Sequence, residues 1–110
     1  RALGSAGAFA ECLKAFDRAI AVKDAAELRL GRGLCHHSLK DEKAALQDFE
    51  AAVKLSPQFA LAHYYVGQSL LELGKRQEAI RALEEAARLA DNEQLAQKAR
   101  DAAAAARKKK

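Results

Sequence analysis

The sequence has no tryptophan, no methionine and a single proline, Pro57. It also has few of the β-branched residues that suit the pleated surface of a sheet, which excludes a β-sheet protein. Alanine and leucine are abundant instead, and both residues favour helix. The chain is therefore predicted to be all-α, and its alanine content predicts helices that pack closely over small contacts.

A long apolar run is also missing from the sequence. No stretch approaches the roughly 20 apolar residues that a membrane-spanning helix needs, and no signal peptide is recognisable at the amino terminus. We therefore expect a cytoplasmic protein with no membrane partner. Because the sequence lacks an initiator methionine and its first helical pattern begins midway, we also expect residues to precede Arg1.

Neither sign of charge dominates the body of the chain. The net charge of +4 at pH 7 lies in the last four residues, Arg107 to Lys110, and the rest of the chain has 15 basic and 15 acidic residues. A surface of mixed charge argues against nucleic-acid binding. The basic tail is expected to be a solvated end that suits a helix C-terminus, with a phosphate or membrane contact as the alternative.

Cysteine is rare, with only Cys12 and Cys35 in the chain. Both stand at small-residue positions on helix faces that the apolar pattern predicts to be buried. We expect them to be small core residues rather than disulfide partners, since free cysteine is among the most buried residue types. This expectation indicates a reducing, intracellular setting.

Apolar residues recur at spacings of three and four, which is the period of amphipathic helices. Gly4, Ser5 and Gly7 are expected to break a partial first helix, and Pro57 ends a later one. The full helices are expected at residues 9–22, 26–39, 44–55, 59–73, 77–90 and 93–106.

Two of these helix pairs repeat each other. With an offset of 34 residues, Gly33 matches Gly67 and Phe49 matches Leu83. A fixed offset in this range indicates stacked helical hairpins. The chain is accordingly divided, as a single domain, into a partial repeat at 1–25, repeats at 26–59 and 60–92, a capping helix at 93–106 and a basic tail at 107–110.

The repeated residues resemble the tetratricopeptide repeat family, whose pattern places small and aromatic residues at fixed positions of a helix pair. The matching residues are Gly33, Ala45, Phe49, Ala52, Pro57, Val66, Gly67, Leu70, Ala79, Leu83 and Ala86. The sequence departs from the pattern at Arg29 and His63, where an aromatic is usual, at Arg32 instead of leucine, and at Asp91 instead of proline. The resemblance implies a right-handed superhelical stack of antiparallel hairpins with a C-terminal capping helix.

The resemblance also implies a binding surface, because the first helices of the repeats line a concave groove in this family. The ligand-binding residues expected there are Leu30, Gly31, Leu34, His37, Leu61, Tyr64, Tyr65, Gln68 and Lys98. This mixture suits a peptide with apolar side chains, for which Tyr64 and Tyr65 are natural anchors. The alternative is that both tyrosines only pack between helices.

Catalytic and metal chemistry have little support in the sequence. His36 and His37 are adjacent on a helix, so their side chains point about 100° apart and do not easily share one metal ion. The chain has no phosphate-binding glycine loop and no paired acidic motif. We expect no enzyme activity, no metal, no cofactor and no small-molecule substrate.

The function predicted is a non-catalytic protein–protein interaction module that binds a peptide or a partner helix in the groove. One alternative is a co-chaperone or ubiquitin-ligase arm that binds the C-terminal tails of chaperones. Residues 32–35 and 62–68 resemble such proteins, although Gly31, Leu61 and Tyr65 stand where their carboxylate-binding side chains would be. A second alternative is a scaffold that self-associates through exposed repeat ends.

Overall fold

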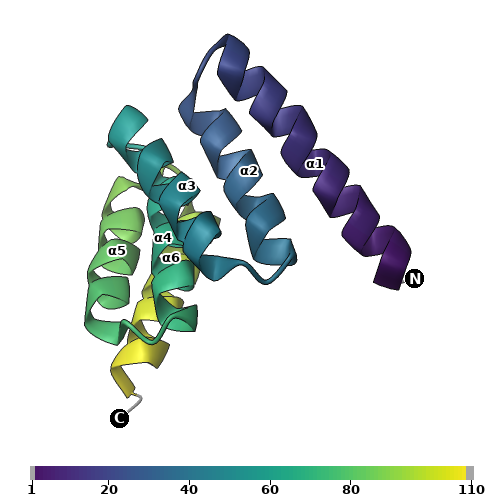
Figure 1. Cartoon of the computed structure of the whole chain (residues 1–110). Coiled ribbons are helices and arrows are strands. Elements are labelled where there is room, and N and C mark those ends of the chain that lie inside the picture. The colour runs from purple at the N-terminus through teal and green to yellow at the C-terminus, as the bar shows by residue number, and fades with distance from the viewer. Residues whose placement is uncertain (1, 109–110) are drawn as a thin grey trace.

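The structure is a computed structural model that describes residues 2–108, with side chains from residue 8 onward. Arg1 and two residues of the expected basic tail, Lys109 and Lys110, lie outside the described residues. The described chain is all-α, as the sequence predicts (Figure 1). Its helices are α1 (Ala2–Val22), α2 (Ala26–Ser38), α3 (Glu42–Leu55), α4 (Ala60–Glu72), α5 (Arg76–Leu89) and α6 (Glu93–Lys108).

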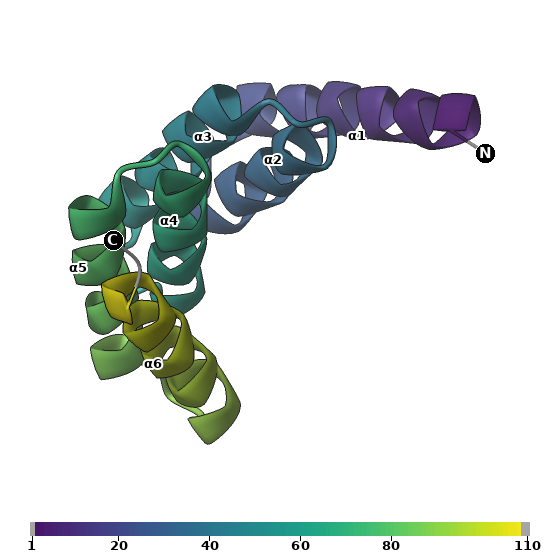
Figure 2. The ribbon, with the colours of Figure 1, turned by 90° about the horizontal axis from the view of Figure 1, so that it is seen from below.

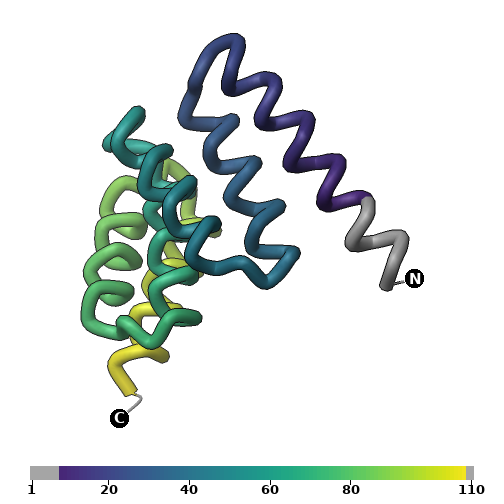
Figure 3. The backbone as a smooth tube through the Cα atoms, in the orientation of Figure 1, coloured from purple at the N-terminus to yellow at the C-terminus, as the bar shows by residue number. Residues whose placement is uncertain are grey.

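The helices form a curved stack in which each one packs against the next (Figure 1). Seen along the stack, α1, α3 and α5 lie on the outer side of the arc and α2, α4 and α6 on the inner side (Figure 2). The smooth backbone trace shows how short the connections between successive helices are (Figure 3). Short connections hold neighbouring helices antiparallel. The inner side of the arc is therefore built from α2, α4 and α6.

Local sequence signals fix the helix ends. Asp41 caps α3, because its side chain accepts a hydrogen bond from the Ala44 backbone N–H at 3.3 Å. Asn92 does the same for α6 through the Leu95 N–H at 2.8 Å. The turn between α4 and α5 contains Gly74 with φ +81°, a left-handed conformation that suits glycine.

Two glycines let the paired helices come close together. A Cβ at Gly33 would stand 2.5 Å from Phe49 Cε1, and one at Gly67 would stand 2.6 Å from Leu83 Cγ. In both places the carbonyl oxygen of an alanine, Ala45 or Ala79, is the next neighbour. Gly33 and Gly67 therefore occupy equivalent surroundings, and each admits a large side chain from the partner helix.

The core follows from this close approach. Phe49 and Leu83 are almost fully buried, and several alanines of the same helices and of α4 are fully buried as well. These alanines are Ala45, Ala52, Ala62, Ala79 and Ala86. The last helix, α6, buries only alanines, Ala96, Ala99, Ala103 and Ala106, while it packs against α5. It covers the end of the stack with a thin apolar face and keeps its other faces polar.

The structure corrects the expected break at Gly4, Ser5 and Gly7, because α1 runs from Ala2 to Val22 without interruption. Glycine in a helix costs only about 1 kcal/mol relative to alanine. Without a proline nearby, these residues do not end the helix.

The structure also corrects the expectation for the cysteines. Cys12 of α1 and Cys35 of α2 form a disulfide, with their Cα atoms 6.4 Å apart. The antiparallel packing of α1 on α2 brings the two positions to a separation that a disulfide can span. Cys35 is buried and Cys12 is half-buried. The pairing removes the argument that the cysteines indicate a reducing compartment.

Within residues 2–108, none of the helices combines the length and the apolar character that crossing a membrane requires.

Replacing Gly67 by valine is expected to destabilise the stack. The new side chain meets Leu83, whose Cγ would lie 2.6 Å from its Cβ, and overpacking of this kind costs about 2 kcal/mol. The free energy of unfolding can be measured by urea titration followed by circular dichroism. The cost of Gly67→Val should shrink in a Leu83→Ala background, because that change removes the clashing side chain. Equal costs in both backgrounds would contradict the proposed contact.

Candidate peptide-binding groove

A cavity of about 230 Å³ opens on the inner side of the stack. We call it the tyrosine cavity, because Tyr64 and Tyr65 of α4 form much of its wall. His37 of α2, Gln68 of α4 and Lys98 of α6 also line it. The three inner helices therefore each contribute to one cavity.

Aromatic packing fixes the position of the two tyrosines. The Tyr65 ring stacks on Phe49 of α3, with ring centroids 5.3 Å apart and planes inclined by 25°. Tyr64 meets Tyr65 edge to face at 5.4 Å. Both tyrosines are half-buried, so each ring leaves part of its surface open. Rigid aromatic side chains with partly open faces are suited to anchor an apolar ligand group.

A second cavity, of about 440 Å³, lies between the first turn of α4 and α6. We call it the leucine cavity, because Leu61, Leu89 and Leu95 are among its lining residues. Lys98 lines this cavity as well as the tyrosine cavity, so the two lie side by side.

A third cavity, of about 430 Å³, lies at the other end of α4. Gln68 lines it together with Leu71 of α4, Arg76 of α5 and alanines of α6. Because Gln68 also lines the tyrosine cavity, the three cavities follow one another along the space between α4 and α6. We refer to them together as the inner groove. Three cavities that follow one another suit an extended chain, whose successive side chains can enter them in turn.

The structure brings together most of the residues that the sequence selects for binding. His37, Tyr64, Tyr65, Gln68 and Lys98 share the tyrosine cavity, and Leu61 lines the leucine cavity.

Three selected residues lie elsewhere. Leu30 belongs to the hydrophobic core, with 7% of its surface exposed, and Leu34 packs against that core. Gly31 lies directly beneath the Phe16 ring of α1. These positions lie outside the three cavities because α1 and the core occupy the space around them.

The adjacent histidines turn to different partners. His37 Nδ1 lies 2.5 Å from Glu42 Oε2, and His36 Nε2 lies 3.5 Å from Asp48 Oδ2. Within the described residues, no three histidine, cysteine or acidic side chains gather as a metal site would need.

Sequence reasoning missed two members of the tyrosine cavity. Phe49 fits the repeat pattern and is absent from the expected binding residues, yet it also lines the cavity. Ser69 is 1% exposed, and its hydroxyl has no hydrogen-bond partner in the described structure. The sequence signal for Ser69 is its position 34 residues after Cys35, because both positions of the repeat carry a small residue.

Comparison with known protein families decides which repeat this is. The family model for the tetratricopeptide repeat matches residues 1–60, and a second model of the same description matches residues 60–93. The chain belongs to the tetratricopeptide repeat family. No curated protein sequence matches it.

Three solved structures of two proteins, the type III secretion chaperone SycD and PcrH, have the same arrangement. SycD of Yersinia enterocolitica, in complex with a peptide of the translocator YopD, matches with a TM-score of 0.85 and 18% identity over 92% of this chain and 81% of its own. PcrH in complex with the chaperone-binding region of PopD matches with a TM-score of 0.86 and 23% identity over 93% and 80% of the two chains. PcrH from Pseudomonas aeruginosa matches with a TM-score of 0.84 and 25% identity over 93% and 81%.

An ion-pair network explains two departures from the tetratricopeptide repeat pattern. Arg32 of α2 donates hydrogen bonds to both carboxylate oxygens of Asp48 on α3, at 2.8 and 2.9 Å. Arg29 lies 3.5 Å from the same carboxylate, and Asp17 of α1 accepts a hydrogen bond from Arg32 at 2.7 Å. The side chain of Asp48 is only 4% exposed. The two arginines thus replace apolar residues because a buried carboxylate on the neighbouring helix needs them.

The network also shifts the pKa of Arg32 and the pKa of Asp24. Hydrogen bonds to Asp48 raise the pKa of the Arg32 guanidinium above its ordinary value, against the opposing effect of burial. The hydrogen bond from Arg29 lowers the pKa of Asp24 in the connection between α1 and α2. The side-chain hydrogen bonds of the network join α1, α2 and α3.

Replacing Asp48 by alanine should lower the free energy of unfolding by about 2 kcal/mol, because Arg32 loses its two hydrogen bonds to a buried carboxylate and keeps only its exposed partner Asp17. Asp17→Ala is the matched control, since Asp17 is exposed at the rim of the same network and such pairs contribute under about 1 kcal/mol. Urea titration at pH 7 measures both variants. If both variants lost a similar free energy of unfolding, the burial of Asp48 would not make its ion pair more stabilising than that of Asp17.

Proposed function

We propose that this tetratricopeptide repeat chain is a non-catalytic interaction module that binds a peptide segment of another protein in the inner groove. The observation that carries the proposal is the tyrosine cavity, where the inner helices present two half-exposed aromatic rings and polar side chains together. Burial of apolar anchors against such rings supplies affinity, and Gln68 offers hydrogen bonds to a peptide backbone.

The comparison structures support this proposal. SycD is solved with a peptide of YopD, and PcrH with the chaperone-binding region of PopD. The two chaperones share the fold of this chain over 92–93% of its length. A peptide segment is therefore the partner class for which the groove is most suited.

The alternative of binding a chaperone's C-terminal carboxylate has less support. Two of the positions that would need charged donors carry Leu61 and Tyr65, and the third, Gly31, lies under Phe16. Without charge-assisted hydrogen bonds at these positions, a terminal carboxylate would add little to the affinity for a peptide.

Truncation of an anchor tests the proposed function. Random linear peptides displayed on phage can be selected on the wild-type protein and then synthesised for calorimetry. Tyr65→Ala is expected to raise the Kd of the selected peptides about tenfold or more, because a central aromatic anchor is removed. Helicity, measured by far-ultraviolet circular dichroism, should stay close to that of the wild type.

Two further variants make the result specific. Tyr65→Phe keeps the stacked ring and should retain most of the affinity. Phe9→Ala truncates a half-buried aromatic on α1, outside the inner groove, and should leave the Kd unchanged. Peptides that bind Tyr65→Ala as tightly as the wild type would refute the proposal.

A further inference from the structure

Lys98 holds a distinctive place in the inner groove. It belongs to α6 and lines both the tyrosine cavity and the leucine cavity, so its side chain lies where the two cavities meet. Any chain that passes from one cavity to the other has to pass Lys98.

Lys98 shares the tyrosine cavity with Glu72 and the leucine cavity with Asp91, but it pairs with neither carboxylate. Within residues 8–108 it takes part in no ion pair, whereas its α6 neighbours Arg100 and Arg107 pair with Glu93 and Glu84. His37, the other basic side chain that lines these two cavities, is held by Glu42 at 2.5 Å. Lys98 is thus the lining cation of these two cavities that is left for a ligand.

Ser69 also lines the tyrosine cavity, and its hydroxyl is buried and lacks a hydrogen-bond partner in the described structure. Because this oxygen is covered, it is not open to a ligand. Lys98 is therefore the charged donor that the tyrosine cavity presents beside its aromatic rings.

We propose that Lys98 selects peptides that carry an acidic side chain next to the apolar anchor bound at Tyr64 and Tyr65. This inference rests on the proposed function, because it names the chemistry of the peptide in the same groove. The aromatic rings bind the apolar side chain, and the ammonium group pairs with the neighbouring carboxylate. Lys98 is exposed, so the ion pair should contribute about as much as a surface pair does.

Two acidic side chains that line the same cavities as Lys98 would favour the opposite kind of ligand, a basic peptide. Glu72, at the end of α4, lines the tyrosine cavity, and Asp91 lines the leucine cavity. Each of them borders one cavity, whereas Lys98 borders both, so the cation meets a bound chain over a longer stretch. If Glu72 or Asp91 dominated instead, the groove would prefer basic peptides.

The test starts from peptides selected on the wild type and counter-selected on Tyr65→Ala. An acidic residue should be enriched beside the apolar anchor. One selected peptide is then synthesised with glutamate, glutamine or lysine at that position, with an acetylated N-terminus and an amidated C-terminus. The glutamate peptide should bind the wild type about fivefold more tightly than the glutamine peptide, as for a partly exposed ion pair.

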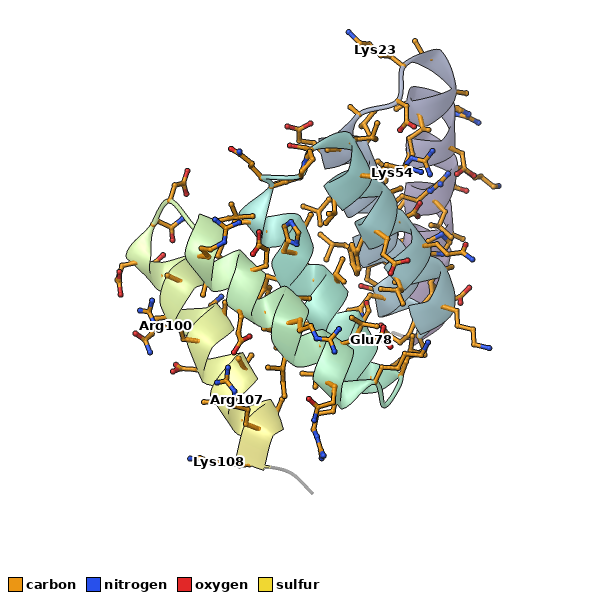
Figure 4. The ribbon with its side chains drawn as sticks, turned by 90° about the vertical axis from the view of Figure 1, so that its left-hand side faces the viewer. Lys23, Lys54, Glu78, Arg100, Arg107 and Lys108 are labelled. Atoms are coloured by element: carbon orange, nitrogen blue, oxygen red, sulfur yellow. A yellow bond between two sulfur atoms is a disulfide. The ribbon has the colours of Figure 1, made fainter. Side chains whose placement is uncertain are left out.

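Charge reversal assigns the preference to one residue. Lys98→Gln should abolish the preference for glutamate, and Lys98→Glu should make the lysine peptide the tightest binder. Lys54→Glu is the matched control, because Lys54 is exposed on α3, on the face that α3 and α5 form (Figure 4); it should leave the preference intact. Raising the salt concentration should narrow the gap between the glutamate and glutamine peptides.

Each outcome separates this inference from the proposed function. Peptides that depend on Tyr65 but show no preference for acid, or whose preference survives Lys98→Glu, would overturn the role of Lys98 and leave peptide binding intact. A preference for lysine peptides would also overturn it. Tight binding only by peptides with a free C-terminus would assign the carboxylate to a chain end instead. Failure to obtain any Tyr65-dependent peptide would overturn both proposals.

Discussion

The close approach of paired helices at Gly33 and Gly67 is the constraint on which the rest of the structure depends. Because neither position carries a side chain, Phe49 and Leu83 reach across the hairpins and fill the space between them. The small contacts let successive hairpins stack in an arc, and the arc separates inner helices from outer ones. The inner groove is a consequence of this packing rather than of any special loop.

Within that frame, equivalent repeat positions acquire different roles. Gly31 and Tyr65 are separated by the 34-residue repeat offset, and each faces an aromatic ring of the preceding helix. At Gly31 the ring of Phe16 fills the space, whereas Tyr65 stacks on Phe49 and still reaches the cavity. The helical scaffold is therefore the same in both repeats. The length of the side chain at the position of Gly31 and Tyr65 decides where a cavity opens.

Much of the fold could be predicted from the sequence, since apolar spacing and the repeat offset specify helices and their pairing locally. The disulfide of Cys12 and Cys35 could not, because a burial pattern gives faces but not the distance between two particular positions on packed helices. The same limit applies to Leu30, which faces inward but is covered by the core. The sequence could not predict that the Ser69 hydroxyl lacks a hydrogen-bond partner, because that depends on which groups of other helices lie near it.

The central claim is that the inner side of the arc, and not its outer side, receives the partner. Amide chemical-shift mapping of the labelled protein with a selected peptide tests it most directly. The account predicts that the largest shifts fall on the inner helices, around His37, Gln68 and Lys98. Shifts concentrated instead on the outer helices, around Lys54 of α3 and Glu78 of α5 (Figure 4), would contradict it.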